Sequence, residues 1–247
     1  MKTLKFAFLC LATSLFLFTG CLENRGNYQK FSHVNSVVTS FSEFPGMTFL
    51  YTSAYFEAVA VPELNDAGYK NGDCLISSFT LDYDNQPTGK YATATEVVER
   101  KLGQADILML DAADQTDIQH TIDLLSVDSI QSVVLLGSNP CIANKLFMGF
   151  SQNDYRTQNY EYQLVYSDLL IDDIPVLYVC AKKSDTASGI LIDNHLCQAF
   201  DLSSFLSKYT DDENNRFSFY LKYKRNVDED GKNLYHSFLI ENMPNLK

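Results

Sequence analysis

The chain contains no tryptophan and only four histidines among its 247 residues. The lack of tryptophan weakens the case for an aromatic platform that stacks against sugars. The histidines form no clustered motif, which argues against a serine or cysteine triad, and no two cysteines have the Cys-x-x-Cys spacing of a zinc site. We therefore predict no catalytic residue, no metal ligand and no cofactor.

Basic residues are also scarce, with 19 lysines and arginines against 31 aspartates and glutamates and a net charge of −12. Such a surface repels phosphate backbones and anionic lipid head groups. Nucleic acid is therefore not an expected partner, and a neutral or basic partner is favoured. Any attachment to a membrane has to come from acyl chains rather than from a basic patch.

The main apolar run, Phe6 to Phe18, is too short to cross a membrane, since it has thirteen residues and a spanning helix needs roughly 20. Two lysines precede the run, and the small pair Thr-Gly follows it directly before Cys21. This pattern is typical of a secretory signal, and its end resembles a lipobox, where bacterial lipoproteins are cut and acylated on the new N-terminal cysteine. We predict a signal peptide at residues 1–20, an anchor in the lipid bilayer through palmitate-type acylation of Cys21, and a place in the cell envelope. We expect the protein to be anchored in the outer membrane, on either the periplasmic face or the cell-surface face.

Removal of residues 1–20 leaves 227 residues and takes away two lysines but no acid, so the net charge changes from −12 to −14. That length is sufficient for two small domains or one large all-β domain. Residues 21–32 are polar and contain a glycine and two asparagines, which predicts a short tether between the lipid and the first domain.

Four cysteines remain after the signal and Cys21 are set aside: Cys74, Cys141, Cys180 and Cys197. An exported protein can pair them in three ways. They are equally consistent with buried, unpaired thiols, and both interpretations stay open at this point.

Short strands separated by turn residues fill the next part of the chain. Cys74 to Tyr83 alternates apolar and polar side chains, and Pro45-Gly46 and Asn71-Gly72-Asp73 mark turns. Five short strands in about seventy residues suit a small OB-like barrel, and we assign residues 33–125 to it. The five expected strands are Val34–Phe41, Thr48–Thr52, Tyr55–Val61, Cys74–Tyr83 and Lys90–Arg100.

One helix is expected, between Asp114 and Leu125. Ile118, Ile122 and Leu125 recur at helical spacing, and the segment begins with acids. The short apolar run from Ala105 to Leu110 precedes it. Because the strand alternation lapses here, we predict a domain boundary between Asp111 and Asp128.

The remainder, residues 126–247, is again rich in strands, which predicts an antiparallel β-sandwich. Ser132 to Leu136 is apolar like a central strand, and Asp230-Gly231 is a strong hairpin signal. The fold class is therefore all-β, with an OB-like barrel followed by a sandwich.

Three groups of residues are candidate sites. Asp193, His195 and Cys197 would share one strand face and could begin a metal site, but a loop acid, a partly buried histidine and a core thiol explain them better. The acidic runs 211–213 and 228–230 lack EF-hand spacing and suit solvated loops. The tyrosines could stack against sugars, although strand alternation favours core packing; they are Tyr155, Tyr160, Tyr162 and Tyr166.

Several short motifs together resemble the NigD-like family of envelope lipoproteins. They are the lipobox at Cys21, the Gly72-Asp73 turn, Asp128-Ser129-Ile130 before Lys145–Phe150, Phe200–Ser204, and the hairpin around Tyr220–Tyr235. The resemblance implies an N-terminal OB-like domain, a C-terminal β-sandwich and an association with bacteriocin immunity, and it supplies no catalytic residues.

We therefore expect a non-enzymatic, lipid-anchored binding or protective module whose partner is an unknown protein or envelope component. Two alternatives remain open. A glycan- or fibre-associated accessory lipoprotein would show an exposed aromatic groove, and a hydrolase would show a cleft with a paired base and nucleophile.

Overall fold

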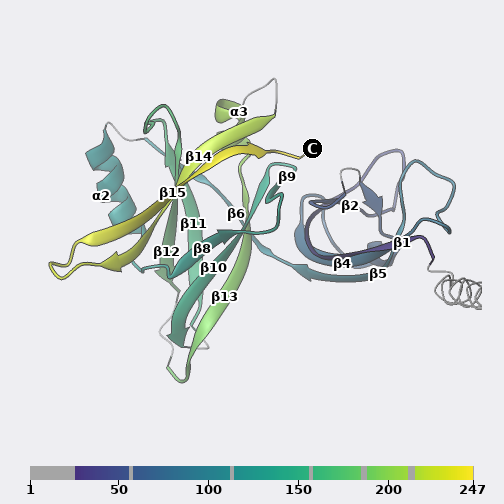
Figure 1. Cartoon of the computed structure of the whole chain (residues 1–247), viewed down its shortest axis with the longest axis horizontal. Helices are drawn as coiled ribbons and strands as arrows, with labels where there is room; N and C mark the ends of the chain where they lie inside the picture. Colours follow the sequence, from purple (N-terminus) through teal and green to yellow (C-terminus); the bar gives the residue numbers. More distant parts are fainter. Residues whose placement is uncertain are drawn as a thin grey trace, which may run out of the picture.

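A computed structural model of the chain describes residues 26–55, 58–111, 114–155, 158–184, 188–210 and 215–246. It is all-β, with three five-stranded sheets and two short α-helices in the described part, so the predicted fold class is confirmed. The predicted signal and Cys21 lie outside the described residues. Figure 1 shows the first sheet at one end of the long axis and the other two sheets at the other end.

The first sheet has the strand order β3-β2-β1-β4-β5 and curls into a partly open barrel. Its strands are β1 (Tyr28–Thr39), β2 (Phe49–Thr52), β3 (Val59–Ala60), β4 (Cys74–Asp82) and β5 (Ala94–Lys101), with a 3-10 turn η1 (Pro62–Leu64) after β3. A parallel bridge between Ala60 and Thr93 brings the two ends of the sheet together. Inside, Phe31 and Phe79 stack at 4.9 Å in a core that also contains Leu75. The barrel matches the five-stranded OB-like prediction.

Strand β1 begins at Tyr28, within the segment that the sequence predicted to be a tether. Gln29 and Lys30 pair with β4, while Phe31 points into the core. The first three residues of β1 are exposed and Phe31 is its first core residue, so the barrel starts earlier than residue 33.

The other two sheets pack face to face as a sandwich. The second sheet has the order β6-β13-β10-β8, with β9 paired to β10, and the third has the order β15-β14-β12-β11-β7. The second sheet contains β6 (Gly103–Asp106), β8 (Ser132–Leu135), β9 (Cys141–Ile142), β10 (Lys145–Tyr155) and β13 (Leu191–Asp201). The third contains β7 (Leu108–Leu110), β11 (Tyr160–Ser167), β12 (Val176–Lys183), β14 (Arg216–Val227) and β15 (Asn233–Pro244). Phe150 and Phe200 from the second sheet meet Tyr162 and Phe219 from the third in one buried core.

The sandwich differs from its prediction in two respects. It is not wholly antiparallel, because β6 pairs with β13, β7 with β11 and β12 with β14 in parallel. Strand β8 is an edge strand rather than a central one, and Val134 is exposed. The Asp230-Gly231 turn joins β14 to β15 as expected, with Gly231 at a φ of 81°.

Consecutive strands β5, β6 and β7 enter three different sheets. Only Leu102 separates β5 from β6, and only Ile107 separates β6 from β7. The chain therefore passes from the barrel to the sandwich at Leu102, and the predicted assignment of residues 103–125 to the barrel is wrong. Independent folding of the two parts stays a prediction.

The expected helix is present as α2 (Gln115–Leu125), where the Asp114 side chain accepts hydrogen bonds from the backbone N–H groups of Thr116 and Asp117. Ile118 and Ile122 pack on the outer face of the third sheet. A second helix, α3 (Ser203–Tyr209), was not predicted; it buries Phe205 at one end of the sandwich core. None of the helices in the described ranges is long and apolar enough to cross a membrane.

Barrel and sandwich meet in a buried joint. Val37 and Cys74 of the barrel pack with Leu102, Ile142 and Phe147. Two amides cross the joint: Asn35 Nδ2 donates to the Leu136 carbonyl at 2.7 Å, and Asn139 Nδ2 donates to the Ser53 carbonyl at 3.0 Å. The joint therefore combines apolar burial with directional hydrogen bonds.

Candidate functional site

An open, polar hollow of about 500 Å³, called the cavity below, lies at one end of the sandwich. The segment that joins α2 to β8 forms one wall, and the ends of β10, β11, β12 and β14 form the rest. The side chains that matter for its chemistry are Asp128, Gln152, Asp154, Tyr160, Lys183 and Arg225. The volume lies within the range of small-ligand sites.

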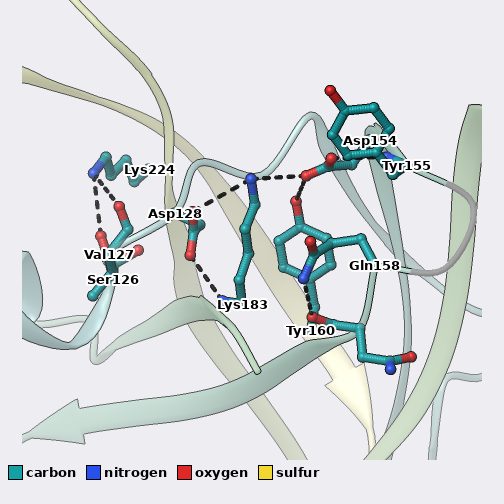
Figure 2. Close-up of polar contacts among 10 residues, drawn as sticks. Ser126, Val127, Asp128, Asp154, Tyr155, Gln158, Tyr160, Lys183 and Lys224 are labelled. Atoms are coloured by element: carbon teal, nitrogen blue, oxygen red, sulfur yellow. Dashed lines mark hydrogen bonds and ion pairs between the residues drawn. The ribbon is translucent and has the colours of Figure 1, made fainter. Parts of the chain in front are cut away.

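The ammonium group of Lys183 links two carboxylates across this cavity, as Figure 2 shows. Its Nζ lies 2.8 Å from Asp154 Oδ2 and 4.0 Å from Asp128 Oδ1. The Tyr160 hydroxyl donates to the same Asp154 oxygen at 2.5 Å, and the backbone N–H of Tyr155 donates to the other at 2.7 Å. Asp128 Oδ2 accepts from the backbone N–H of Lys183 at 2.8 Å.

These bonds fix the protonation states of the network. Burial acts to raise the pKa of Asp154, but the hydrogen bonds from Lys183 and Tyr160 outweigh it and lower the pKa to about 2. The hydrogen bond to Asp154 raises the pKa of Lys183, and burial followed by the same carboxylate raises that of Tyr160. At neutral pH the aspartate is ionised while the lysine and the tyrosine are protonated, so none of the three suits general acid–base catalysis, which needs a pKa near the working pH.

A buried lysine fixes the segment between α2 and β8, which forms one wall of the cavity, through hydrogen bonds. Lys224 is 7% exposed, and its Nζ donates to the carbonyls of Ser126 and Val127 at 3.2 and 2.9 Å. The backbone N–H groups of Asp128 and Ile130 donate to the carbonyls of Ala181 and Lys224. Figure 2 shows Lys224 beside this segment. The cavity is therefore preformed.

Two lining residues keep unused hydrogen-bond donors. Gln152 is 5% exposed, and its Nε2 has no hydrogen-bond partner within the described residues. Burial raises the pKa of neighbouring Tyr162 to about 12, while the Gln152 side chain, which lies near the Tyr162 hydroxyl without a hydrogen bond of normal geometry, lowers it. Arg225 is exposed, and none of the ion pairs among the described residues involves it.

Asp193, His195 and Cys197, which the sequence analysis considered as a possible metal site, lie along one strand, β13, as expected. Across the strand pair, Ser151 Oγ lies 2.9 Å from His195 Nδ1 on an exposed surface. No carboxylate pairs with His195, and no group of three potential metal ligands occurs, within the ranges that the structure describes. The structure therefore does not bring these residues together as a site.

The tyrosines and the acidic run at 228–230 follow the simpler interpretations. Tyr162 and Tyr166 are buried in the sandwich core, and only Tyr160 lines the cavity. Asp228 Oδ1 accepts from the backbone N–H groups of Asp230 and Lys232 and so shapes the hairpin turn. The run at 211–213 lies outside the described residues.

The four remaining cysteines are free thiols in the structure. Burial raises the pKa of three of them to about 12, which leaves them as unreactive core side chains. The three are Cys74, Cys141 and Cys180. Cys197 is partly exposed. None of the three possible disulfide pairings is formed.

No family model matches the chain. No curated protein matches it either. The fold has solved relatives. An uncharacterized protein from Parabacteroides merdae is 15% identical, with a TM-score of 0.61 over 85% of this chain and 95% of that chain. A protein of unknown function from Bacteroides vulgatus is 13% identical, with a TM-score of 0.55 over 86% and 90%. These two matches show a shared fold over nearly the whole molecule.

A NigD-like immunity protein from Bacteroides caccae also aligns, 15% identical, over 86% of this chain and 96% of that chain. Its TM-score of 0.44 is too low to carry an argument about function. The chain thus has an all-β fold shared with solved Bacteroides and Parabacteroides proteins.

Proposed function

We propose that the protein is a non-enzymatic, lipid-anchored component of the cell envelope that works as a binding module through the cavity at the end of the sandwich. The observation that carries the proposal is the Asp128–Lys183–Asp154 network. It gives a preformed polar surface on which Asp154 and Lys183 stay charged near neutral pH, which suits recognition rather than proton transfer.

The anchor rests on Cys21, which follows the small residues that close the signal. Two or three acyl chains there would hold the molecule on a membrane almost permanently, since each buried methylene contributes about 0.8 kcal/mol. A protective role of the immunity type rests on the family resemblance of the sequence. The partner in that role is a neutral or basic protein or envelope component, because the chain carries a strong negative charge.

The cavity is tested by capture from envelope extract with the full mature chain in detergent. Lys183→Met should lose the captured partner, because it removes the cation between the two carboxylates. Lys182→Met is the matched control, since Lys182 is the preceding exposed residue of the same strand and does not line the cavity. Capture should weaken at high salt. Equal recovery by both variants would contradict the proposal.

The hydrolase alternative makes a different prediction at Ser151 and His195. If the purified protein cleaved peptides or glycosides, and if Ser151→Ala or His195→Ala abolished that turnover, the non-enzymatic proposal would be wrong. We expect no turnover, because the described contacts give His195 no carboxylate partner to orient it.

A further inference from the structure

We propose that the group recognised in the cavity is a carboxylate, carried by the C-terminus of a peptide or by a sugar acid. This inference rests on the proposed binding function and names its ligand chemistry. It follows from three observations on the lining: which hydrogen-bonding groups are already used, which remain free, and how the charges balance.

The carboxylate acceptors of the cavity are largely occupied by the protein itself. Both oxygens of Asp154 accept hydrogen bonds, one from the backbone N–H of Tyr155 and the other from Tyr160 and Lys183. Asp128 Oδ2 accepts the backbone N–H of Lys183, and its other oxygen faces the same lysine's ammonium group. A ligand that offers only donors would therefore compete with bonds that already exist.

Two of the remaining groups in the lining are strong donors. Gln152 Nε2 is buried in the lining without a partner in the described structure, and a buried donor of this kind calls for an acceptor. Arg225 presents a planar guanidinium with five N–H donors and no ion-pair partner there. Arginine binds carboxylates with two parallel hydrogen bonds. Because both residues line the same cavity, one acceptor group bound there would meet both sets of donors.

The charges favour a group with one negative charge. In the lining, Lys183 and Arg225 balance Asp128 and Asp154, so the cavity does not share the strong negative charge of the chain. A phosphate monoester carries nearly two negative charges and would place them beside both aspartates. A carboxylate carries one and matches the geometry of the guanidinium.

The test is a calorimetric titration of the full mature chain in detergent with N-acetyl-Ala-Ala, its C-terminal amide, glucuronate, glucose and inorganic phosphate. We expect at least one carboxylate to bind, and its neutral counterpart to bind at least about tenfold more weakly, the loss that corresponds to one charge-assisted hydrogen bond. Binding of the peptide acid alone would identify a peptide C-terminus, and binding of glucuronate alone would identify a sugar acid.

Variants assign the binding to the cavity. Arg225→Gln should weaken binding of the carboxylate ligand by about tenfold or more. Arg225→Lys should weaken it less, because lysine keeps the positive charge but cannot donate two parallel hydrogen bonds. Arg100→Gln, at an exposed arginine of the barrel, is the matched control and should change nothing. Gln152→Leu should also weaken binding, with thermal unfolding used to show that the variant remains folded.

Equal affinities for acid and amide, preference for phosphate, or an Arg225→Gln variant that binds like the unmodified protein would each overturn the carboxylate assignment. These results are separable from failure of the proposed function. If no carboxylate binds but envelope capture still depends on Lys183, only the ligand chemistry is wrong. If capture is also unaffected by Lys183→Met, the cavity is not the binding site at all.

Discussion

Replacing Asp154 with asparagine should destabilise the folded protein at neutral pH and leave it almost unaffected in strong acid. The carboxylate accepts from Tyr160 and pairs with Lys183, and these bonds lower its pKa from an ordinary 3.8 to about 2. Asparagine keeps the shape and loses the charge. Because folding lowers this pKa, the stabilising contribution is complete above about pH 5 and is lost as the pH falls through the folded-state value near 2.

The magnitude follows from the same values. A fall in pKa from 3.8 to about 2 corresponds to about 2.4 kcal/mol of unfolding free energy at neutral pH. The Asp154 side chain is only 12% exposed, but its partner Lys183 is 41% exposed, so solvent screens part of the interaction. We therefore expect the variant to lose about 1–2 kcal/mol at pH 7.

Urea unfolding of both proteins at pH 7, 5, 3 and 2 measures this difference. It should be constant from pH 7 to pH 5 and shrink towards zero at pH 2. Asp193→Asn is the control, because Asp193 is an exposed acid on the neighbouring strand. A difference that stays the same from pH 7 to pH 2, or one that the Asp193 variant reproduces, would refute the reasoning.

Three further predictions concern the anchor, the end of the sandwich and the connection between its parts. Cys21→Ala should abolish uptake of labelled palmitate and release the protein from membranes, and continued labelling would rule out this anchor. Phe205→Ala should lower the unfolding free energy by about 3–5 kcal/mol, because the ring is fully buried; a loss below 1 kcal/mol in urea unfolding would show that α3 is dispensable. A single proteolytic cut next to Asp111 should leave two fragments that co-elute on gel filtration until denaturant is added, because β6 and β7 remain paired with β13 and β11; separate elution in native buffer would contradict this.

Local signals were sufficient for much of the fold. Asp114 with the isoleucines at helical spacing predicted α2, and Asp230-Gly231 predicted the last hairpin, because each signal lies within the element that it specifies. Strand β8 was assigned correctly but placed wrongly, since its position at the sheet edge depends on strands far away in the chain. Helix α3 had a weak local signal in Asp201, which lies two residues before the helix begins. Its Oδ1 accepts a hydrogen bond from the backbone N–H of Ser203, the first residue of α3.

The cavity could not be predicted in the same way. Asp128, Asp154 and Lys183 come from three segments separated by more than twenty residues each, and only the pairing of β11 with β12 and the packing of the two sheets bring them together. The trio on β13 was easier to notice because its members are neighbours in sequence. Alternation along a strand places side chains on one face, but it does not supply a partner on the other side.

The single-residue connection at Leu102 has a consequence for how the protein would stand on a membrane. Leu102 is buried in the joint, and its backbone N–H donates to the Cys74 carbonyl at 2.9 Å, so the barrel and the sandwich have no free hinge between them. Tyr28 follows Cys21 by seven positions in the sequence, and a chain of that length reaches at most about 25 Å. With a lipid on Cys21, the barrel would remain close to the bilayer and act as a rigid pedestal. The sandwich, which lies at the opposite end of the long axis from the start of β1 (Figure 1), would then hold the cavity away from the lipid surface, within reach of partners that never touch the membrane.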